Sequence, residues 1–141
     1  MILCINGDRE CTDMSVLEKA IAHFKIDIDS IAEIVSGGAR GADKLGEKFA
    51  KRNKIPIKVF EADWDDIDSP GAVIKYNKFG KPYNAKAGFT RNADMAAYSD
   101  QLLCLQPNGE TNGSQGCVKD FKNLDKTVYV FPENKEKKYK F

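Results

Sequence analysis

Apolar and polar residues alternate along the chain in blocks that predict strands and helices in turn. Short continuous apolar runs are typical of strands buried on both faces of a sheet, whereas apolar residues three and four positions apart predict amphipathic helices. The predicted strands are residues 2–6, 31–36, 56–61, 101–106 and 127–131. The predicted helices are residues 13–24, 42–53, 91–98 and 114–124, and Asp13 is placed to cap the first of them.

This alternation predicts an α/β domain with a parallel sheet covered by helices on both faces. Right-handed crossovers favour a Rossmann-like, doubly wound sheet, for which we expect five core strands in the order 3-2-1-4-5. Ligands of such sheets bind at the carboxyl ends of the strands, near the point where the strand order reverses. Here that point lies between the first and the fourth strand.

Two segments depart from the alternation. Residues 65–87 are polar and contain glycine, proline and aromatic residues, so we expect an inserted loop or small flap within a domain of residues 1–131. Residues 132–141 form a lysine-rich tail.

Composition narrows the classes of partner. The 141 residues suit one domain, and 22 basic against 21 acidic residues give a net charge of +1, which makes duplex DNA or an anionic membrane an improbable partner. No stretch is long and apolar enough to span a bilayer, and the first residues lack the pattern of a signal peptide, so we expect a cytoplasmic protein. The four cysteines form no C-x-x-C pair and His23 is the lone histidine, so we expect no metal. No cofactor is predicted.

The most informative segment is Ser-Gly-Gly-Ala-Arg-Gly-Ala-Asp at residues 36–43, between a predicted strand and a predicted helix. A glycine-rich turn at a helix N-terminus gathers backbone N–H groups and partial positive charge, and Arg40 adds donors suited to phosphate oxygens. The alternative is a purely structural turn, since glycine also serves where a strand turns sharply into a helix. The segment lacks the Lys-Ser/Thr ending of a P-loop, so no magnesium-dependent NTPase is inferred.

Three further turns are expected at the same edge of the sheet, at residues 6–9, 87–92 and 112–117. Each turn is rich in glycine or small polar residues. Because each glycine costs conformational entropy on folding, several such turns at one edge favour a shared function over a purely structural explanation. The predicted ligand-binding residues are Gly7, Arg9, Gly37, Gly38, Ala39, Arg40, Gly41, Asp43, Arg91, Asn92, Gly113, Ser114 and Gly116.

These turns resemble those of a known family. The segments that carry the resemblance are Gly7-Asp8-Arg9, residues 36–43, Ala62-Asp63-Trp64, and Ala87-Gly88 leading to Arg91-Asn92 and Met95. Their content and order are similar to those of the SLOG superfamily, best of its YspA/YpsA-related branch; the superfamily also includes the LOG nucleotide phosphoribohydrolases and the DprA/Smf proteins. The resemblance covers about residues 1–131. It implies a Rossmann-like fold that binds a nucleotide or nucleotide-derived ligand, and it supplies no reaction.

The chain departs from the family pattern before the fourth helix. Relatives often carry Pro-Gly-Gly-x-Gly-Thr there, whereas residues 112–117 are Asn-Gly-Ser-Gln-Gly-Cys. The glutamate that follows this motif in LOG enzymes matches Asp120, which is one methylene shorter. Asp120 is therefore a weak candidate for a catalytic group, and phosphate binding is the better supported expectation.

Several residues carry two interpretations. Arg40 and Arg91 either bind a ligand phosphate or pair with Asp43 and Asp94. Asp43 either binds ribose hydroxyls or caps the second helix, and Trp64 either stacks on a base or plugs the edge of the sheet.

The leading hypothesis is a nucleotide-binding sensor or processing module. One alternative is an enzyme that hydrolyses the N-glycosidic bond of a nucleotide, and another is a DprA-like protein that binds single-stranded DNA. The sequence leaves the base, the number of phosphates and turnover open, and a homodimer is compatible with it.

Overall fold

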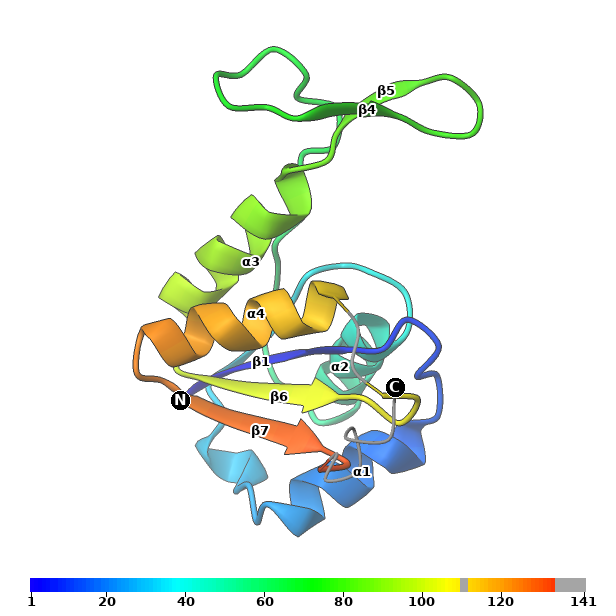
Figure 1. Ribbon diagram of the computed structural model, residues 1–141. Helices are drawn as coiled ribbons and strands as arrows, with labels where there is room; N and C mark the ends of the chain where they lie inside the picture. Colours follow the sequence, from blue (N-terminus) through cyan, green and yellow to red (C-terminus); the bar gives the residue numbers. More distant parts are fainter. Residues whose placement is uncertain (110–111, 134–141) are drawn as a thin grey trace.

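The computed structural model describes residues 1–109 and 112–133 (Figure 1). The strands are β1 (Ile2–Gly7), β2 (Glu33–Ser36), β3 (Ile57–Val59), β4 (Ile74–Tyr76), β5 (Pro82–Asn84), β6 (Gln101–Leu105) and β7 (Thr127–Phe131). The helices are α1 (Met14–His23), α2 (Ala42–Arg52), α3 (Ala87–Tyr98) and α4 (Asn112–Asn123), with a 3₁₀ turn at Ile28–Ser30 that the pattern did not predict. Most of the predicted tail, residues 134–141, lies outside the described residues.

Five strands form one parallel sheet in the order β3-β2-β1-β6-β7. The predicted parallel α/β sheet is therefore confirmed. The predicted numbering 3-2-1-4-5 is not, because two further strands, β4 and β5, intervene in the chain; β6 and β7 occupy the places expected for the fourth and fifth strands. The order reverses between β1 and β6, where Cys4 pairs with Leu102.

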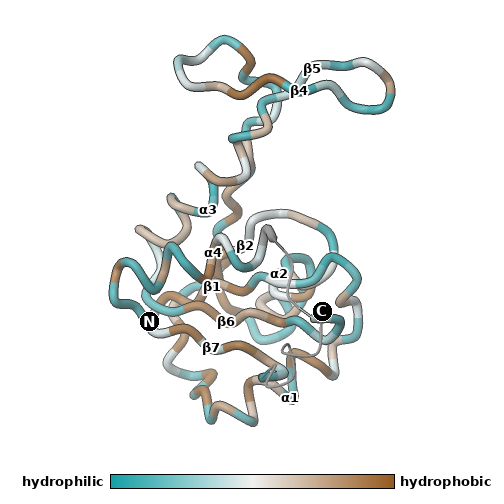
Figure 2. The backbone as a smooth tube through the Cα atoms, in the orientation of Figure 1, coloured by the Kyte–Doolittle hydropathy of each residue, from teal (hydrophilic) through white to brown (hydrophobic). Residues whose placement is uncertain are grey.

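The core lies on both faces of this sheet. Successive side chains of a strand point to opposite faces, so Leu3 and Ile5 pack in one cluster with helices α1 and α2, while Cys4 packs in another with α3 and α4. Figure 2 shows the hydrophobic residues concentrated along the central strands. Asp13 caps α1 as predicted, because its carboxylate accepts a hydrogen bond of 2.9 Å from the backbone N–H of Ser15.

The segment predicted as a loop or flap contains an antiparallel hairpin of β4 and β5, which stands away from the sheet beyond the N-terminal end of α3 (Figure 1). Helix α3 begins at Ala87, four residues before the predicted start. The sequence pattern did not predict this first turn, because it contains Gly88 and glycine is a poor helix former. Glycine at this position lets the Trp64 ring approach closely, since a Cβ there would lie 3.0 Å from it.

None of the helices within the described residues is long and apolar enough to cross a membrane. In the same part of the chain, no three His, Cys, Asp or Glu side chains gather closely enough to hold a metal ion.

Candidate functional site

A cavity of about 370 Å³ lies at the carboxyl ends of β1 and β2, next to the point where the strand order reverses. It is lined by Asn6, Gly7, Asp8, Arg9, Glu10, Ala39, Arg40, Asp43, Arg91, Asn92, Met95 and Ser114. A second cavity of about 470 Å³ shares Arg9, Arg40 and Arg91 with the first and extends past Gly37 and Gly38 to Trp64. The two together form a crevice along the glycine-rich loop, which we define as residues 36–41.

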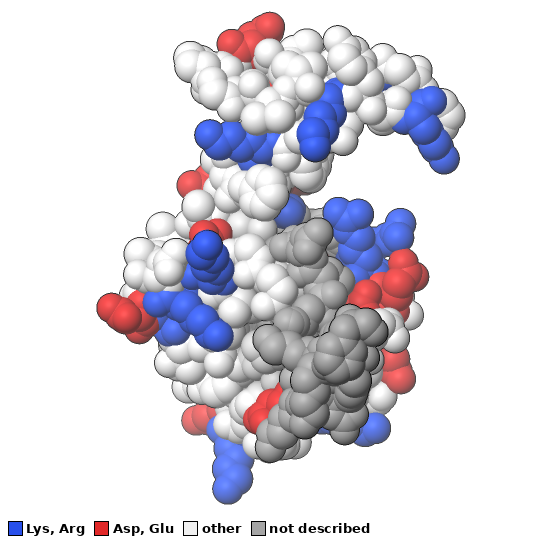
Figure 3. Space-filling view, viewed as in Figure 1, with Lys and Arg blue, Asp and Glu red and all other residues white. Residues whose placement is uncertain are grey.

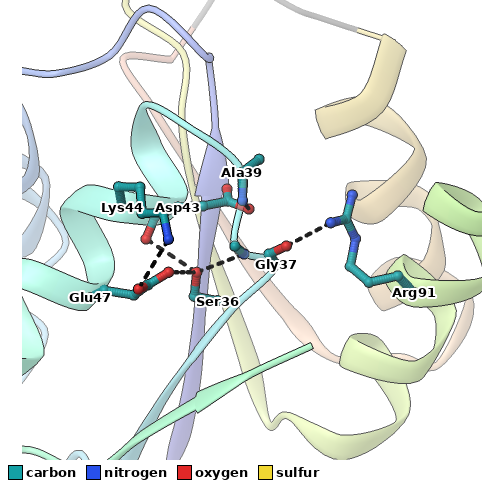
Figure 4. Close-up of polar contacts among 8 residues, drawn as sticks. Ser36, Gly37, Ala39, Asp43, Lys44, Glu47 and Arg91 are labelled. Carbon is teal, nitrogen blue, oxygen red and sulfur yellow. Dashed lines mark hydrogen bonds and ion pairs between the residues drawn. The ribbon is translucent and has the colours of Figure 1, made fainter. Parts of the chain in front are cut away.

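The glycine-rich loop is anchored by the side chain of its first residue, Ser36, which is fully buried. The Ser36 hydroxyl accepts a hydrogen bond of 3.0 Å from the Gly38 N–H and lies 2.7 Å from a Glu47 carboxylate oxygen, to which it donates (Figure 4). Gly41 has a positive φ of 79°, and a Cβ there would lie 2.4 Å from the backbone oxygens of Asp8 and Arg9. Glycine is therefore required at position 41, where the loop packs against the turn after β1.

Asp43 braces the same loop from the first turn of α2. Its side chain is only 6% exposed, and its Oδ2 atom accepts a hydrogen bond of 3.2 Å from the Ala39 N–H. Burial raises the pKa of Asp43 to about 6, against the opposing effects of the Ala39 hydrogen bond and the positive charge of Arg91. Asp43 does not cap α2, because its carboxylate accepts its hydrogen bond from the loop. The carboxylate stabilises the loop and also lines the cavity.

Arg91 joins α3 to the glycine-rich loop. Its Nη1 atom donates a hydrogen bond of 2.7 Å to the Gly37 carbonyl (Figure 4), and its Nε atom donates one of 3.0 Å to the Asn92 side-chain oxygen. A Cβ at position 37 would lie 3.0 Å from Arg91 Nη1 and 2.8 Å from Asp43 Oδ2. Gly37 therefore sits between the two charged groups, and no ion pair joins Arg91 to Asp94 among the described residues.

The two other arginines differ in their partners. Arg40 forms an exposed ion pair of 2.9 Å with Glu10, not with Asp43. The Arg9 side chain, which lines both cavities, makes no hydrogen bond or ion pair with any residue in the described ranges. Arg9 is therefore the arginine of the crevice that is most available to an anion.

Two polar atoms in the first cavity are buried without a partner. They are the Oδ1 atom of Asn6 and the Oδ2 atom of Asp8, and neither makes a hydrogen bond within the described part of the chain. The two residues are 6% and 5% exposed. The other carboxylate oxygen of Asp8 accepts a hydrogen bond of 2.8 Å from the Glu10 N–H, so only one side of this carboxylate is satisfied.

The structure gathers most of the predicted site residues. Those that line the first cavity are Gly7, Arg9, Ala39, Arg40, Asp43, Arg91, Asn92 and Ser114, and those that line only the second are Gly37 and Gly38. Gly41 and Gly116 are not lining residues; Gly41 packs against the turn after β1, and Gly116 and Gly113 lie within α4.

The weak catalytic candidate, Asp120, is half-buried and lines neither cavity, and partial burial raises its pKa. The lining residues absent from the predicted set are Asn6, Asp8, Glu10 and Met95. For Asn6 and Asp8 the signal was present, because both belong to the turn of residues 6–9 that was expected at this edge of the sheet.

The Trp64 ring lies at the surface. It is partly exposed, lines the second cavity and contacts Tyr83 edge-on with ring centroids 6.4 Å apart. Cys117 is a fully buried free thiol that packs with Cys4 and Cys104 in the core, which fits a structural role. A hydrogen bond with Cys117, together with burial, raises the pKa of Cys4 well above its ordinary value.

The fold and the cavity define the chain as a Rossmann-like α/β protein with a crevice where such sheets bind ligands. Residues 1–66 match the family model YAcAr, the YspA, cpYpsA-related SLOG family. The resemblance to the YspA/YpsA-related branch of the SLOG superfamily is thereby confirmed over residues 1–66.

One solved structure gives the same fold over nearly the whole chain. It is the X-ray structure of DNA processing protein A (DprA) from Streptococcus pneumoniae, with a TM-score of 0.63 and 16% sequence identity. The match covers 96% of this chain and 51% of DprA, so the chain spans about half the length of that protein. A comparison with curated proteins gives no match.

Proposed function

We propose that the chain binds a nucleotide or a nucleotide-derived phosphate ligand in the crevice at the carboxyl edge of its sheet. The observation that carries this proposal is the meeting of Arg9, Arg40 and Arg91 around a cavity of about 370 Å³ with buried polar atoms in its wall. Such a cavity is of the size that holds a small molecule, and arginine is suited to phosphate oxygens. The SLOG family match and the DprA fold are consistent with a role related to nucleotides or DNA.

The phosphate would be held by side chains more than by the glycine-rich loop. The N–H groups of Gly38 and Ala39 already donate to Ser36 and Asp43, so they are not available to an anion. Arg9, by contrast, has no partner within the described residues and lines both cavities. The partly exposed ring of Trp64 lies at the far end of the crevice, where a base would stack on it.

The enzymatic alternative rests on Asp43. A carboxyl group whose pKa is about 6 changes protonation near neutral pH, which is a requirement for general acid or base catalysis. Asp43 lines the cavity, whereas Asp120 does not. If the protein is a nucleotide N-glycosidic hydrolase, Asp43 is the better placed carboxyl group.

The DNA-binding alternative rests on the hairpin. Tyr76 and Phe79 are exposed there beside Lys75 and Lys78, and exposed aromatic rings next to cations suit the stacking of single-stranded bases. Figure 3 shows basic side chains on the hairpin and on the body beneath it. These groups lie outside the crevice, so they would add to nucleotide binding and not replace it.

The proposal is tested by calorimetric titration of the protein with adenosine monophosphate and ADP-ribose. We expect Arg9→Ala to weaken binding about tenfold or more and to leave the melting temperature unchanged, because the Arg9 side chain holds no other residue in place. Arg52→Ala is the matched control, since Arg52 is an exposed arginine outside both cavities. Equal affinities of the wild-type protein and Arg9→Ala, or no binding of either compound, would refute the proposal.

A further inference from the structure

The wall of the first cavity contains two buried acceptors that nothing in the described protein satisfies. The Asn6 amide oxygen and one Asp8 carboxylate oxygen have no hydrogen-bond partner, although both residues are more than nine-tenths buried. An unsatisfied buried polar group destabilises the folded protein, and more so when it is charged. Both residues line the first cavity, so a ligand bound there is the nearest source of the missing partners.

The backbone holds this pair in a fixed position. Asn6 lies in the last part of β1, Asp8 follows directly after the strand, and both residues line the first cavity. The Asp8 N–H donates a hydrogen bond of 2.8 Å to the Leu105 carbonyl of β6. A Cβ at Gly7, between them, would lie 1.9 Å from the same carbonyl oxygen, so this peptide is packed directly against β6. The backbone that carries the two side chains is therefore fixed before any ligand arrives.

The charge pattern indicates which part of a ligand faces them. A carboxylate repels a phosphate group, so Asp8 needs a hydrogen-bond donor, while the neighbouring Arg9 suits the anionic end. The hydroxyl groups of a ribose are donors that a ribonucleotide carries whatever its base. Asn6 and Asp8 line the same cavity as Arg9. The cavity therefore offers an acceptor pair and a cation together, which matches the hydroxyl groups and the phosphate of a sugar phosphate.

We infer that Asn6 and Asp8 recognise the ribose hydroxyl groups of the ligand, so that the site selects ribonucleotides over 2′-deoxyribonucleotides. This inference rests on the proposed function and deepens it by naming the sugar. A site whose acceptors are matched by a hydroxyl group rejects the analogue that lacks it, because the buried acceptor is then left unpaired.

The first test compares ligands that differ only at the 2′ position. The probes are the monophosphates of adenosine, guanosine and cytidine, each paired with its 2′-deoxy form, and ribose 5-phosphate paired with 2-deoxyribose 5-phosphate. We expect each ribo compound to bind at least tenfold more tightly than its deoxy partner in calorimetric titrations. Equal binding within every pair would overturn the ribose assignment and leave the proposed function standing. A preference that follows the base would assign the acceptors to the base, whereas no binding of any probe would refute both.

The second test uses Asp8→Asn, which keeps an oxygen to accept from the Glu10 N–H and replaces the unpaired carboxylate oxygen by an amide. We expect the ratio of ribo to deoxy affinity to fall toward one. The lost negative charge favours binding of both forms equally, so the ratio of the two affinities is the quantity to be read. We also expect the melting temperature without ligand to stay the same or to rise, because no internal hydrogen bond of Oδ2 is lost.

Two further variants keep this test interpretable. Asn6→Ala removes the second acceptor and should also lower the ratio, without a loss of stability larger than that of its packing. Asp13→Asn is the matched control, since Asp13 is an exposed aspartate that caps α1 and lines neither cavity. Retention of the full ribo preference in Asp8→Asn and in Asn6→Ala would show that these residues have a purely structural role, and would overturn the inference.

Discussion

The guanidinium group of Arg91 donates a hydrogen bond of 2.7 Å to the carbonyl oxygen of Gly37, a residue 54 positions earlier in the chain. This bond connects α3, which follows the hairpin, to the loop after β2. Asp43 contacts the same loop from α2, through the Ala39 N–H. The position of the glycine-rich loop, and hence the shape of the crevice, depends on these two contacts from opposite sides.

Arg91→Ala should lower both stability and affinity. The variant leaves the Gly37 carbonyl without its charged donor, and hydrogen bonds to charged groups contribute about 1.5–3 kcal/mol. We therefore expect the free energy of unfolding in urea to fall by about 1–3 kcal/mol, and adenosine monophosphate to bind at least tenfold more weakly. Arg91→Lys should recover part of the stability and less of the affinity, since lysine has no planar fork of donors. Unchanged unfolding would mean that the loop is held by other contacts.

Arg40→Ala should separate binding from stability. The pair of Arg40 with Glu10 is exposed, as is the pair of Arg52 with Glu18 at 2.8 Å, and such pairs contribute about 0–1 kcal/mol. Replacement of either arginine by alanine should thus change the melting temperature by a similar small amount. Only Arg40→Ala should weaken phosphate binding, because only Arg40 lines the crevice. Identical affinities of the two variants would remove Arg40 from the site.

Asp43 should make the fold less stable as the pH rises. Its pKa is raised from 3.8 to about 6, so the folded protein holds a proton that the unfolded chain has lost. The resulting cost is absent below about pH 4, develops between about pH 4 and 6, and reaches about 3 kcal/mol above that range.

The variant Asp43→Asn tests this prediction. It should gain stability relative to the wild-type protein as the pH increases from 4.5 to 7, as measured by urea unfolding at each pH. A difference between the two proteins that is constant over this range would show that Asp43 has an ordinary pKa.

Gly7→Ala should destabilise the fold severely. The added Cβ would meet the Leu105 carbonyl oxygen at 1.9 Å, and the φ of 145° is one that L side chains rarely adopt. Because the clash involves two backbones, we expect a loss of about 3 kcal/mol or more. Gly80→Ala is the control: its φ of 79° is also positive, but nothing lies within 4 Å of the added atom, so the loss should be about 1 kcal/mol. Similar losses in both variants would contradict the close approach of β1 and β6.

Nucleoside monophosphates should bind without appreciable release of free base. Asp120 lies outside both cavities, and a catalytic group displaced by about 1 Å loses on the order of a hundredfold in rate. Asp120→Asn should accordingly leave the affinity nearly unchanged. Chromatography of protein incubated with adenosine and cytidine monophosphates measures the free base. Multiple turnovers that are abolished by Asp43→Asn or Asp120→Asn would make the phosphoribohydrolase alternative the leading one.

Hydrophobic periodicity predicted the sheet because the buried strands are continuous apolar runs. The start of α3 and the hairpin were missed for a different reason. Gly88 is unfavourable in a helix by local propensity, and only the Trp64 ring, which packs against it, explains its presence. The strands of the hairpin are three residues long, β4 is exposed, and neither strand contains an apolar run that would reveal it.

The candidate site was predictable in position and less so in detail. Arginines and glycines in the turns at residues 6–9, 36–43 and 87–92 indicated the edge of the sheet where the cavity lies. The partners of those arginines depend on contacts between distant segments, such as Arg40 with Glu10, and no local pattern encodes them. The unsatisfied state of Asn6 and Asp8 is likewise a property of the packed cavity and cannot be read from the residue types.

The central place of β1 has a consequence for synthesis of the chain. Leu3 pairs with Ile34 on one edge of β1 and with Gln101 on the other. As the chain leaves the ribosome, the first edge closes once β2 has emerged, but the second stays open until β6 follows. A nascent chain that ends near residue 66 contains the whole segment that matches the SLOG model, yet lacks α3, α4 and β6. The segment that matches the family model thus leaves the ribosome well before α3 and α4, which complete the cavity.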